Sequence, residues 1–215
     1  MSIMEPSVTA VLSVKSVRRM HSRAVLILSN GETRVMPRAL LRERPYRGGV
    51  PFDEAAFDAL LRERSYPFAL ERAVSLLAVR ARTERELRDA LRQCAYSEAV
   101  IERVISRMNE AGYIDDADFA SQWAASRTSK GLGARRIAME LRQKGVDAEH
   151  IEQALGQLDE EECMESAVRA ARKAARGKEL SSPADRQKVF AALMRKGYDS
   201  ASARRAIEAL RDQQE

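Results

Sequence analysis

Apolar side chains recur at helical spacing through the second two thirds of the chain, and the spacing itself repeats. Three stretches align without a gap at offsets of 50 and 102 residues; they are 86–108, 136–158 and 188–210. In the first stretch Leu87 and Leu91 stand one helical turn apart, and Val104 and Met108 repeat that separation. Each stretch is therefore predicted to hold two amphipathic helices, each with one apolar stripe.

The turn between the two predicted helices also repeats. Gly145 and Gly197 occupy the same aligned position after the first helix, where a residue with a left-handed backbone commonly ends a helix. The first copy has Ala95 there, which costs about 1 kcal/mol if the turn geometry is kept. Shared apolar columns surround the turn: Leu91, Leu141 and Leu193, and then Tyr96, Val146 and Tyr198.

Polar residues mark where helices begin. Three of them coincide immediately before the second helix of each copy, where a side-chain oxygen can accept from first-turn amides: Ser97, Asp147 and Asp199. Thr83 with Glu86 has the spacing of a capping box before the first helix. Ser182, Pro183 and Asp185 indicate the same start in the third copy.

A further helix precedes each copy, at roughly 67–81, 116–127 and 160–176. A lone three-helix unit buries too little surface to be secure, whereas stacked units bury their remaining apolar faces against one another. The predicted fold is mainly α, with tandem three-helix repeats forming an elongated curved array behind a small antiparallel β-hairpin or sheet. The predicted division is 1–50 for the β element and loop, 51–66 for a linking helix, and 67–110, 111–158 and 159–215 for the repeats.

Residues 10–36 differ from the rest of the chain. VLSVKSV and AVLIL are rich in β-branched residues, and SNGE places the Asn-Gly dipeptide of a tight hairpin turn before TRVM. Two or three antiparallel strands are predicted, and so small a sheet should lean on the helices that follow. A helix is expected from about Asp53 to Arg64, with Pro67 interrupting the helical pattern.

Composition narrows the class of protein. Apolar residues make up 45% of the chain and aromatic residues only 5%, which favours helices, and the net charge of +5 permits a polyanionic partner without requiring one. The chain has no long apolar run, and MSIMEPSVTA lacks the pattern of a secretory signal, so we expect a cytoplasmic protein without membrane contact. Cys94 and Cys163 with His21 and His150 have no metal-ligand spacing, and neither metal nor cofactor is expected.

The stretch KGLGARR at 130–136 raises the question of a phosphate-binding loop. A Walker loop needs four residues between its glycines and then Lys followed by Ser or Thr, and a dinucleotide fingerprint needs a third glycine after a strand. The stretch has none of these features, and Gly133 aligns with Thr83 at the start of a helix that recurs three times. We therefore expect Gly131 and Gly133 to form a bend between helices.

The charge follows a block pattern. From Arg127 to Lys144 six cations oppose one acid, residues 147–165 hold eight carboxylates and no cation, and eleven cations oppose four acids from Glu165 to Arg205. Solvated helix faces often look like this, but two basic blocks also suit an extended, negatively charged partner. The candidate partner contacts are Arg127, Lys130, Arg135, Arg136, Lys144, Arg169, Arg172, Lys173, Arg176, Arg195, Lys196, Arg204 and Arg205.

Other residues have competing interpretations. Asp115 or Asp116 in YIDDADF can cap the helix that follows, which we favour over an acid/base or metal site. Phe119 and Trp123 share one helix face and are expected in the core, with a base-stacking platform as the alternative. No Ser/His/Asp, Cys/His or metal-ligand set is present, so no catalytic residue is predicted.

The motifs RARTERELRDAL, AGYIDDADFASQW and KGLGARRIAMELRQKGV closely resemble the RecX family of bacterial recombination regulators, in order and spacing, over about 68–210. The resemblance implies a non-enzymatic regulator in DNA repair, homologous recombination and the SOS response, and we expect the chain to be a monomer. Such a protein would bind the RecA–single-stranded-DNA filament and inhibit its ATPase, strand exchange and co-protease activity. Ala95 departs from the family, which favours glycine at that position.

The residues leave a second function open, in which the chain binds single- or double-stranded DNA directly and without sequence preference. ARRIAMELRQKGVDAEHIEQAL has the outline of a helix-turn-helix with glycine in the turn. Its candidate recognition helix, 148–158, carries Glu149 and Glu152 but no Lys or Arg, and therefore suits a groove lined by phosphates poorly.

Overall fold

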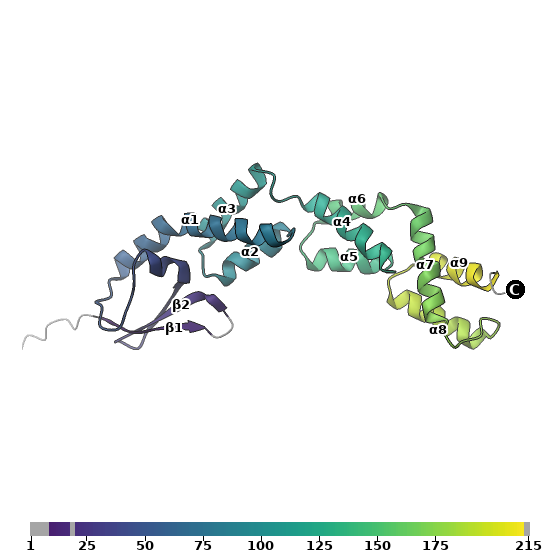
Figure 1. Ribbon diagram of the computed structural model, residues 1–215, viewed down its shortest axis with the longest axis horizontal. Coiled ribbons are helices and arrows are strands. Elements are labelled where there is room, and N and C mark those ends of the chain that lie inside the picture. Colours follow the sequence, from purple (N-terminus) through teal and green to yellow (C-terminus); the bar gives the residue numbers. More distant parts are fainter. Residues whose placement is uncertain (1–8, 18–19, 213–215) are drawn as a thin grey trace, which may run out of the picture. The chain divides into compact units, whose positions relative to one another are not determined.

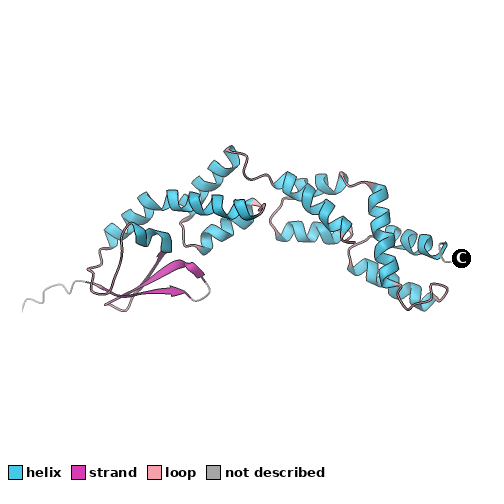
Figure 2. Cartoon of the chain, viewed as in Figure 1, coloured by secondary structure: helices cyan, strands magenta, loops and turns pink. Residues whose placement is uncertain are grey.

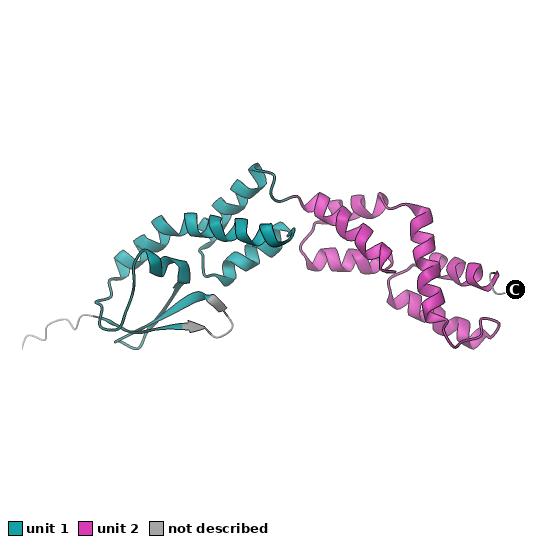
Figure 3. Cartoon of the chain, in the orientation of Figure 1, with its two compact units in different colours: residues 1–114 teal, residues 115–215 magenta. Residues whose placement is uncertain are grey.

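The structure is a computed structural model that describes residues 9–17 and 20–212. It divides into two compact units, Met1–Ile114 and Asp115–Glu215 (Figure 3). Residues 1–8, 18–19 and 213–215 lie outside the described residues. The first of these segments begins the predicted β element and belongs to the N-terminal stretch that lacks the pattern of a secretory signal. The described residues form nine α-helices and one three-stranded sheet, which confirms a mainly α fold of tandem three-helix repeats behind a small antiparallel sheet (Figures 1 and 2).

The sheet is antiparallel and follows chain order. Its strands are β1 (Val11–Val17), β2 (Met20–Leu28) and β3 (Thr33–Pro37). The predicted Asn-Gly turn joins β2 to β3: Gly31 has φ +84°, and the Leu28 amide donates to the Glu32 carbonyl at 2.9 Å. Three strands are therefore present, at the upper end of the predicted number.

The first unit packs the sheet against the first of its helices. A short 3-10 helix, η1 (Arg38–Arg42), follows β3, and α1 (Glu54–Val79) begins at Asp53, whose side chain accepts from the Ala56 amide. One face of the sheet forms a core with Leu40, Tyr46, Phe52 and Phe57. The sheet thus rests on the helices, as its size requires.

The expected interruption at Pro67 is wrong, because α1 continues through it as a single helix of 26 residues. A proline inside a helix removes one backbone hydrogen bond and costs about 3 kcal/mol. Packing on both sides offsets that cost: Phe57 belongs to the core under the sheet, and Ala69 and Ala73 are fully buried in the core of the first repeat. The predicted linking helix and the first helix of the repeat are therefore one element.

An arginine fastens the sheet to the first repeat. The Arg23 guanidinium, on β2, donates to the carbonyls of Arg92, at 2.6 Å, and Gln93. These carbonyls lie at the end of α2 (Glu84–Gln93), where backbone acceptors lack helical partners. A cation at a helix C-terminus is also favoured by the helix dipole.

Each repeat has the same three-helix arrangement, in which the first helix packs against the other two. The first repeat adds α3 (Glu98–Glu110); the second has α4 (Asp116–Ser129), α5 (Ala134–Gln143) and α6 (Ala148–Gly156); the third has α7 (Glu160–Ala174), α8 (Pro183–Arg195) and α9 (Ser200–Asp212). The aligned residues Leu91, Leu141 and Leu193 are all fully buried in their own cores. The repeated apolar columns are therefore core positions.

The predicted turn is present in all three repeats. Ala95, Gly145 and Gly197 have φ values of +65°, +88° and +90°, so the first repeat keeps the turn although its residue is not glycine. The three predicted caps are confirmed as well: Ser97, Asp147 and Asp199 each accept from an amide of the next helix, at 3.4, 2.9 and 2.9 Å.

The capping of the α2 and α8 helices differs. Thr83 accepts from the Glu86 amide at 3.1 Å, as predicted. Ser182 stands at the predicted cap position of α8, but its side chain makes no capping bond, and Asp185 instead accepts from the Glu179 amide at 3.2 Å. The Pro183 ring at the first position removes one amide that would need a partner, which reduces the need for a capping side chain.

Within residues 9–17 and 20–212, no helix combines the length and the apolar character that crossing a membrane would require.

Replacing Ala95 with Gly should stabilise the first repeat by about 0.5–1 kcal/mol, because glycine has no Cβ to strain the left-handed turn. Hydrogen exchange of α2 and α3 amides measures the change within this unit. Ala111→Gly is the matched control, since Ala111 ends α3 with φ −86° and gains nothing from glycine. Slower exchange in the control, or faster exchange in Ala95→Gly, would contradict this account of the turn.

Candidate partner-binding site

Four of the predicted partner contacts lie on or beside the turn between α4 and α5: Arg127, Lys130, Arg135 and Arg136. Asp115 caps α4 by accepting from the Asp118 amide at 2.8 Å, which confirms the capping interpretation of YIDDADF. At the other end Gly131 has φ +79°, and the Leu132 amide donates back to the Arg127 carbonyl at 3.1 Å. The predicted bend is therefore confirmed.

The start of α5 docks onto the third repeat. The Gly133 amide donates to the Lys196 carbonyl at 2.9 Å, and the Arg135 amide donates to the Gly197 carbonyl at 3.0 Å. These two amides are the donors that a phosphate at this helix N-terminus would need. Because they are occupied by carbonyls of the α8–α9 turn, the stretch KGLGARR is a junction between repeats and not a phosphate-binding loop.

Backbone approaches backbone at this junction. A Cβ built on Gly133 overlaps the backbone of Gly197 and Tyr198, and one built on Gly197 overlaps Arg136. Ser166 of α7 reinforces the contact, because its hydroxyl donates to the Thr128 carbonyl at 2.5 Å and lies 3.1 Å from the Tyr198 hydroxyl. Both glycines are thus required by close packing.

The junction gathers four predicted contacts, which we call the junction cluster: Lys130, Arg135, Arg136 and Lys196. The first three side chains are exposed, and the Lys196 ammonium lies near Gly131, 3.6 Å from a Cβ built there. Arg136 approaches Glu140 at 3.5 Å, but its side chain keeps 47% of its exposure. The junction cluster therefore presents cations contributed by two repeats.

Arg127 and Lys144 have a different environment from the junction cluster. The Arg127 guanidinium lies 4.0 Å from the centre of the Trp123 ring and 2.8 Å from a Glu140 carboxylate oxygen, and the Lys144 ammonium lies 4.3 Å from the same ring. Phe119 stacks on Trp123 with centroids 5.7 Å apart. Arg127 and Lys144 therefore help to hold the second repeat together.

The contacts around Trp123 also bear on the two interpretations of Phe119 and Trp123. Phe119 is buried, as expected for a core residue, and Trp123 is partly buried beside it. The Trp123 indole N–H donates to Glu140 at 3.2 Å, and its ring already contacts two cations and Phe119. The core interpretation is favoured over a platform for stacking bases, since an incoming base would have to displace these contacts.

The long helix of the third repeat and the turn that follows it carry exposed cations, which we call the α7 row: Arg169, Arg172 and Lys173 on α7, and Arg176 two residues after its end. The spacing of three and four residues from Arg169 places the first three on one helix face. Arg169 approaches Glu165 at 3.3 Å, a weak, exposed pair.

The last three predicted contacts, Arg195, Arg204 and Arg205, are exposed but do not form one group. Arg204 lines a cavity of about 370 Å³ with Phe190 and Ile207, whereas Arg205 lines another, of about 450 Å³, with Glu160. Among the described residues, no group of three or more His, Cys, Asp or Glu side chains could hold a metal ion.

Sequence reasoning missed a further set of arginines in the first unit. Arg38 and Arg42 on η1 and Arg72 on α1 line one cleft. Only the pairing of η1 with α1 in space brings them together, and no periodicity along the chain signals it.

Fold and surface together define a class: a tandem three-helix protein that carries groups of exposed cations on its helices. Family models match the chain in consecutive order: RecX, first three-helix domain, over 69–108; RecX, second three-helix domain, over 115–155; and RecX, third three-helix domain, over 160–207.

Relatives agree with these models. "Regulatory protein RecX" of Mycolicibacterium smegmatis is 38% identical over 160 residues, which cover 72% of this chain and 84% of that protein. "Regulatory protein RecX" of Amycolatopsis mediterranei is 45% identical over 46% of this chain, and the match spans 57% of the relative's length. A crystal structure of regulatory protein RecX has the same fold, with a TM-score of 0.63 at 23% identity over 95% of this chain and 99% of that one. The chain belongs to the RecX family of regulatory proteins.

Replacing Gly133 with Ala should destabilise the second unit by about 1–3 kcal/mol, because the added methyl group overpacks the junction. Urea unfolding followed by the fluorescence of Trp123, the only tryptophan, reports on this unit. Gly156→Ala is the control, since a Cβ there meets nothing within 4 Å and should leave stability unchanged or slightly raised. Equal unfolding midpoints for the two variants would show that the repeats do not meet here.

Arg127→Ala should lower the stability of the second unit by about 1–2 kcal/mol, because it removes a partly buried ion pair and a cation–π contact together. The control is Lys130→Ala, which removes an exposed cation three residues away and should leave the urea midpoint unchanged. If Arg127→Ala were as stable as the control, the structural role of Arg127 would be wrong, and it would remain a candidate partner contact.

Proposed function

We propose that the chain binds the RecA–single-stranded-DNA filament and inhibits its ATPase, strand-exchange and co-protease activities without catalysing a reaction. The observation that carries the proposal is the consecutive match of all three RecX three-helix domains. Under this proposal the ATPase belongs to the partner, and the chain acts only through binding.

The exposed cations support a partner of negative charge. The junction cluster and the α7 row lie in the same compact unit, and both consist of long side chains that reach into solvent. Single-stranded DNA in the filament supplies phosphates, and acidic side chains of the filament subunits supply carboxylates, both of which arginine binds through paired hydrogen bonds. We propose that all thirteen predicted cations contribute to binding except Arg127 and Lys144, whose contacts with Trp123 give them a structural role.

The repeats explain how binding can inhibit. We propose that the units predicted at 67–110, 111–158 and 159–215 are separate contact modules on successive filament subunits, so that several weak contacts combine. Contacts that span a subunit boundary differ in strength between two filament states. A ligand with such a difference shifts the filament equilibrium without any chemistry of its own.

Direct DNA binding, the alternative function, gains no support from the helix that would read a groove. The α6 helix carries Glu149 and Glu152 and has neither Lys nor Arg. Carboxylates on that helix would face phosphates at the edges of the groove and weaken binding.

A pair of assays separates the two functions. RecA-driven, DNA-dependent ATP hydrolysis is measured with sub-stoichiometric amounts of this protein, alongside its affinity for bare single-stranded DNA across a salt series. Inhibition together with weak, steeply salt-dependent DNA binding supports the regulator. Tight binding to bare DNA without an effect on ATP hydrolysis would reject it in favour of direct DNA binding.

The double variant R135A/R136A should inhibit RecA ATP hydrolysis about tenfold more weakly than the parent, since charge-assisted hydrogen bonds are among the strongest polar contacts. Its melting temperature should stay unchanged, because the junction uses the Arg135 backbone amide, which alanine keeps. The control R47A/R62A removes two exposed cations of the first unit and should inhibit like the parent. A large fall in the melting temperature of R135A/R136A would assign both side chains to the scaffold.

A further inference from the structure

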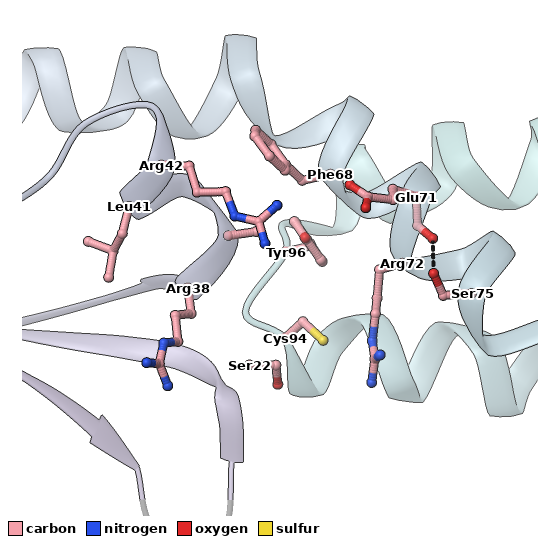
Figure 4. Close-up of a pocket in the computed structure, with 11 residues that line it drawn as sticks. Ser22, Arg38, Leu41, Arg42, Phe68, Glu71, Arg72, Ser75, Cys94 and Tyr96 are labelled. Atoms are coloured by element: carbon pink, nitrogen blue, oxygen red, sulfur yellow. Dashed lines mark hydrogen bonds between the residues drawn. The ribbon is translucent and has the colours of Figure 1, made fainter.

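A cleft of about 710 Å³ opens in the first unit between the sheet and the first repeat (Figure 4). Its walls come from η1, α1 and the turn between α2 and α3. Figure 4 shows Arg42 reaching from η1 toward the middle of the cleft and Arg72 extending from α1, with Ser22 and Cys94 at the floor. Arg38 lines the outer edge on the η1 side.

The three arginines of this cleft have no ion pair among the described residues. Other arginines of the same unit are neutralised by carboxylates: Arg34, Arg64, Arg80, Arg88 and Arg92. The side chains of Arg38, Arg42 and Arg72, in contrast, make no hydrogen bond or ion pair with any residue that the structure describes. Three such guanidinium groups on one concave surface repel one another unless an anion joins them.

The rest of the lining adds little opposing charge. Glu71 is the only carboxylate among the described residues that line the cleft, so its ionised side chains sum to a positive charge. Burial raises the pKa of Tyr96 to about 12, and its phenol therefore stays neutral near pH 7. Phe68 and Leu41 give the cleft an apolar wall beside the cations.

We propose that this cleft binds a phosphate group of a nucleotide, either free or within a single strand, with Arg42 and Arg72 holding the phosphate from opposite walls. Guanidinium groups match phosphate through paired hydrogen bonds. A volume of about 710 Å³ is within the range of small-molecule sites and exceeds what a simple inorganic anion fills. The apolar wall of Phe68 and Leu41 is placed to receive the base or sugar attached to that phosphate.

The site gives the sheet a binding role. Arg38 and Arg42 follow β3 directly, whereas Arg72 belongs to α1, so the cleft exists only while the sheet packs against the first repeat. This site is separate from the junction cluster and the α7 row, which lie in the second unit. The inference does not depend on filament binding, because it concerns the chain and a nucleotide alone.

The test uses the full chain and three probes: tripolyphosphate and ATP by calorimetry, and a short labelled oligothymidine by fluorescence anisotropy. The variant R42A/R72A should bind the probes that the parent binds at least about tenfold more weakly. Its affinity for the oligothymidine should also depend less steeply on salt, by about 0.7 in log–log slope for each phosphate that the variant no longer neutralises.

The variant R47A/R62A is the matched control, because it removes the same charge from exposed sites of the same unit. It should bind each probe like the parent. Melting temperatures of both variants should equal that of the parent, since none of the four arginines pairs with a residue that the structure describes. Competition by ATP against the oligothymidine would show that free nucleotides enter the cleft, whereas strand binding without ATP binding would assign it to a nucleic acid.

Two results would overturn the proposal. One is equal binding of every probe by R42A/R72A and R47A/R62A. The other is preference for an oligoglutamate peptide over all three phosphate probes, which would make the cleft a carboxylate site. RecA is absent from every arm, so failure here is distinguishable from failure of the filament-binding proposal.

Discussion

The turn between the last two helices of each repeat is the constraint on which the fold depends. A residue in the left-handed conformation reverses the chain, and two residues later a Ser or Asp side chain caps the helix that returns. These two local features bring the apolar stripes of the paired helices together over the helix that precedes them. In the third repeat the same turn has a second use, because Gly197 offers its carbonyl to the start of α5. One local motif therefore forms both the repeat core and the contact between repeats.

This double use explains where the cations lie. Helices whose apolar faces are buried in a small core must carry their charges outward. The side chains of Lys130 and Arg135 remain exposed at the junction because the hydrogen bonds that join the repeats there come from backbone amides and from Ser166. A partner could bind Arg135 or Lys130 without competing with the contacts that hold the repeats together. Arg127 differs because Glu140 and Trp123 surround its guanidinium. Position along the chain does not distinguish these arginines, but their neighbours in space do.

Much of the fold follows from the sequence because the features that form it are local. Helix spacing, the capping residues and the glycine column all lie within a few residues of the structure they specify, and Asn30-Gly31 specifies the hairpin in the same way. Pro67 misleads because the penalty of a proline is local, whereas the packing that offsets it comes from two separate cores. The cleft arginines escape sequence reasoning for a related reason: Arg42 and Arg72 are 30 residues apart and meet only through tertiary packing. The sequence identifies the cations that are candidate contacts, but it does not show which of them already pair with another residue of the chain, as Arg127 does with Glu140.

The shared helix α1 has a consequence for how the first unit can change. Its first half covers the sheet with Phe57, Leu60 and Leu61, and its second half builds the repeat with Ala69 and Ala73. Cutting the chain before Asp53 would remove the sheet and expose the apolar side chains on the first half of α1 to water. The sheet and the first repeat are thus joined by one helix into a single folded body, and a natural place to shorten this polypeptide is the link at Ile114, where one compact unit ends and the next begins.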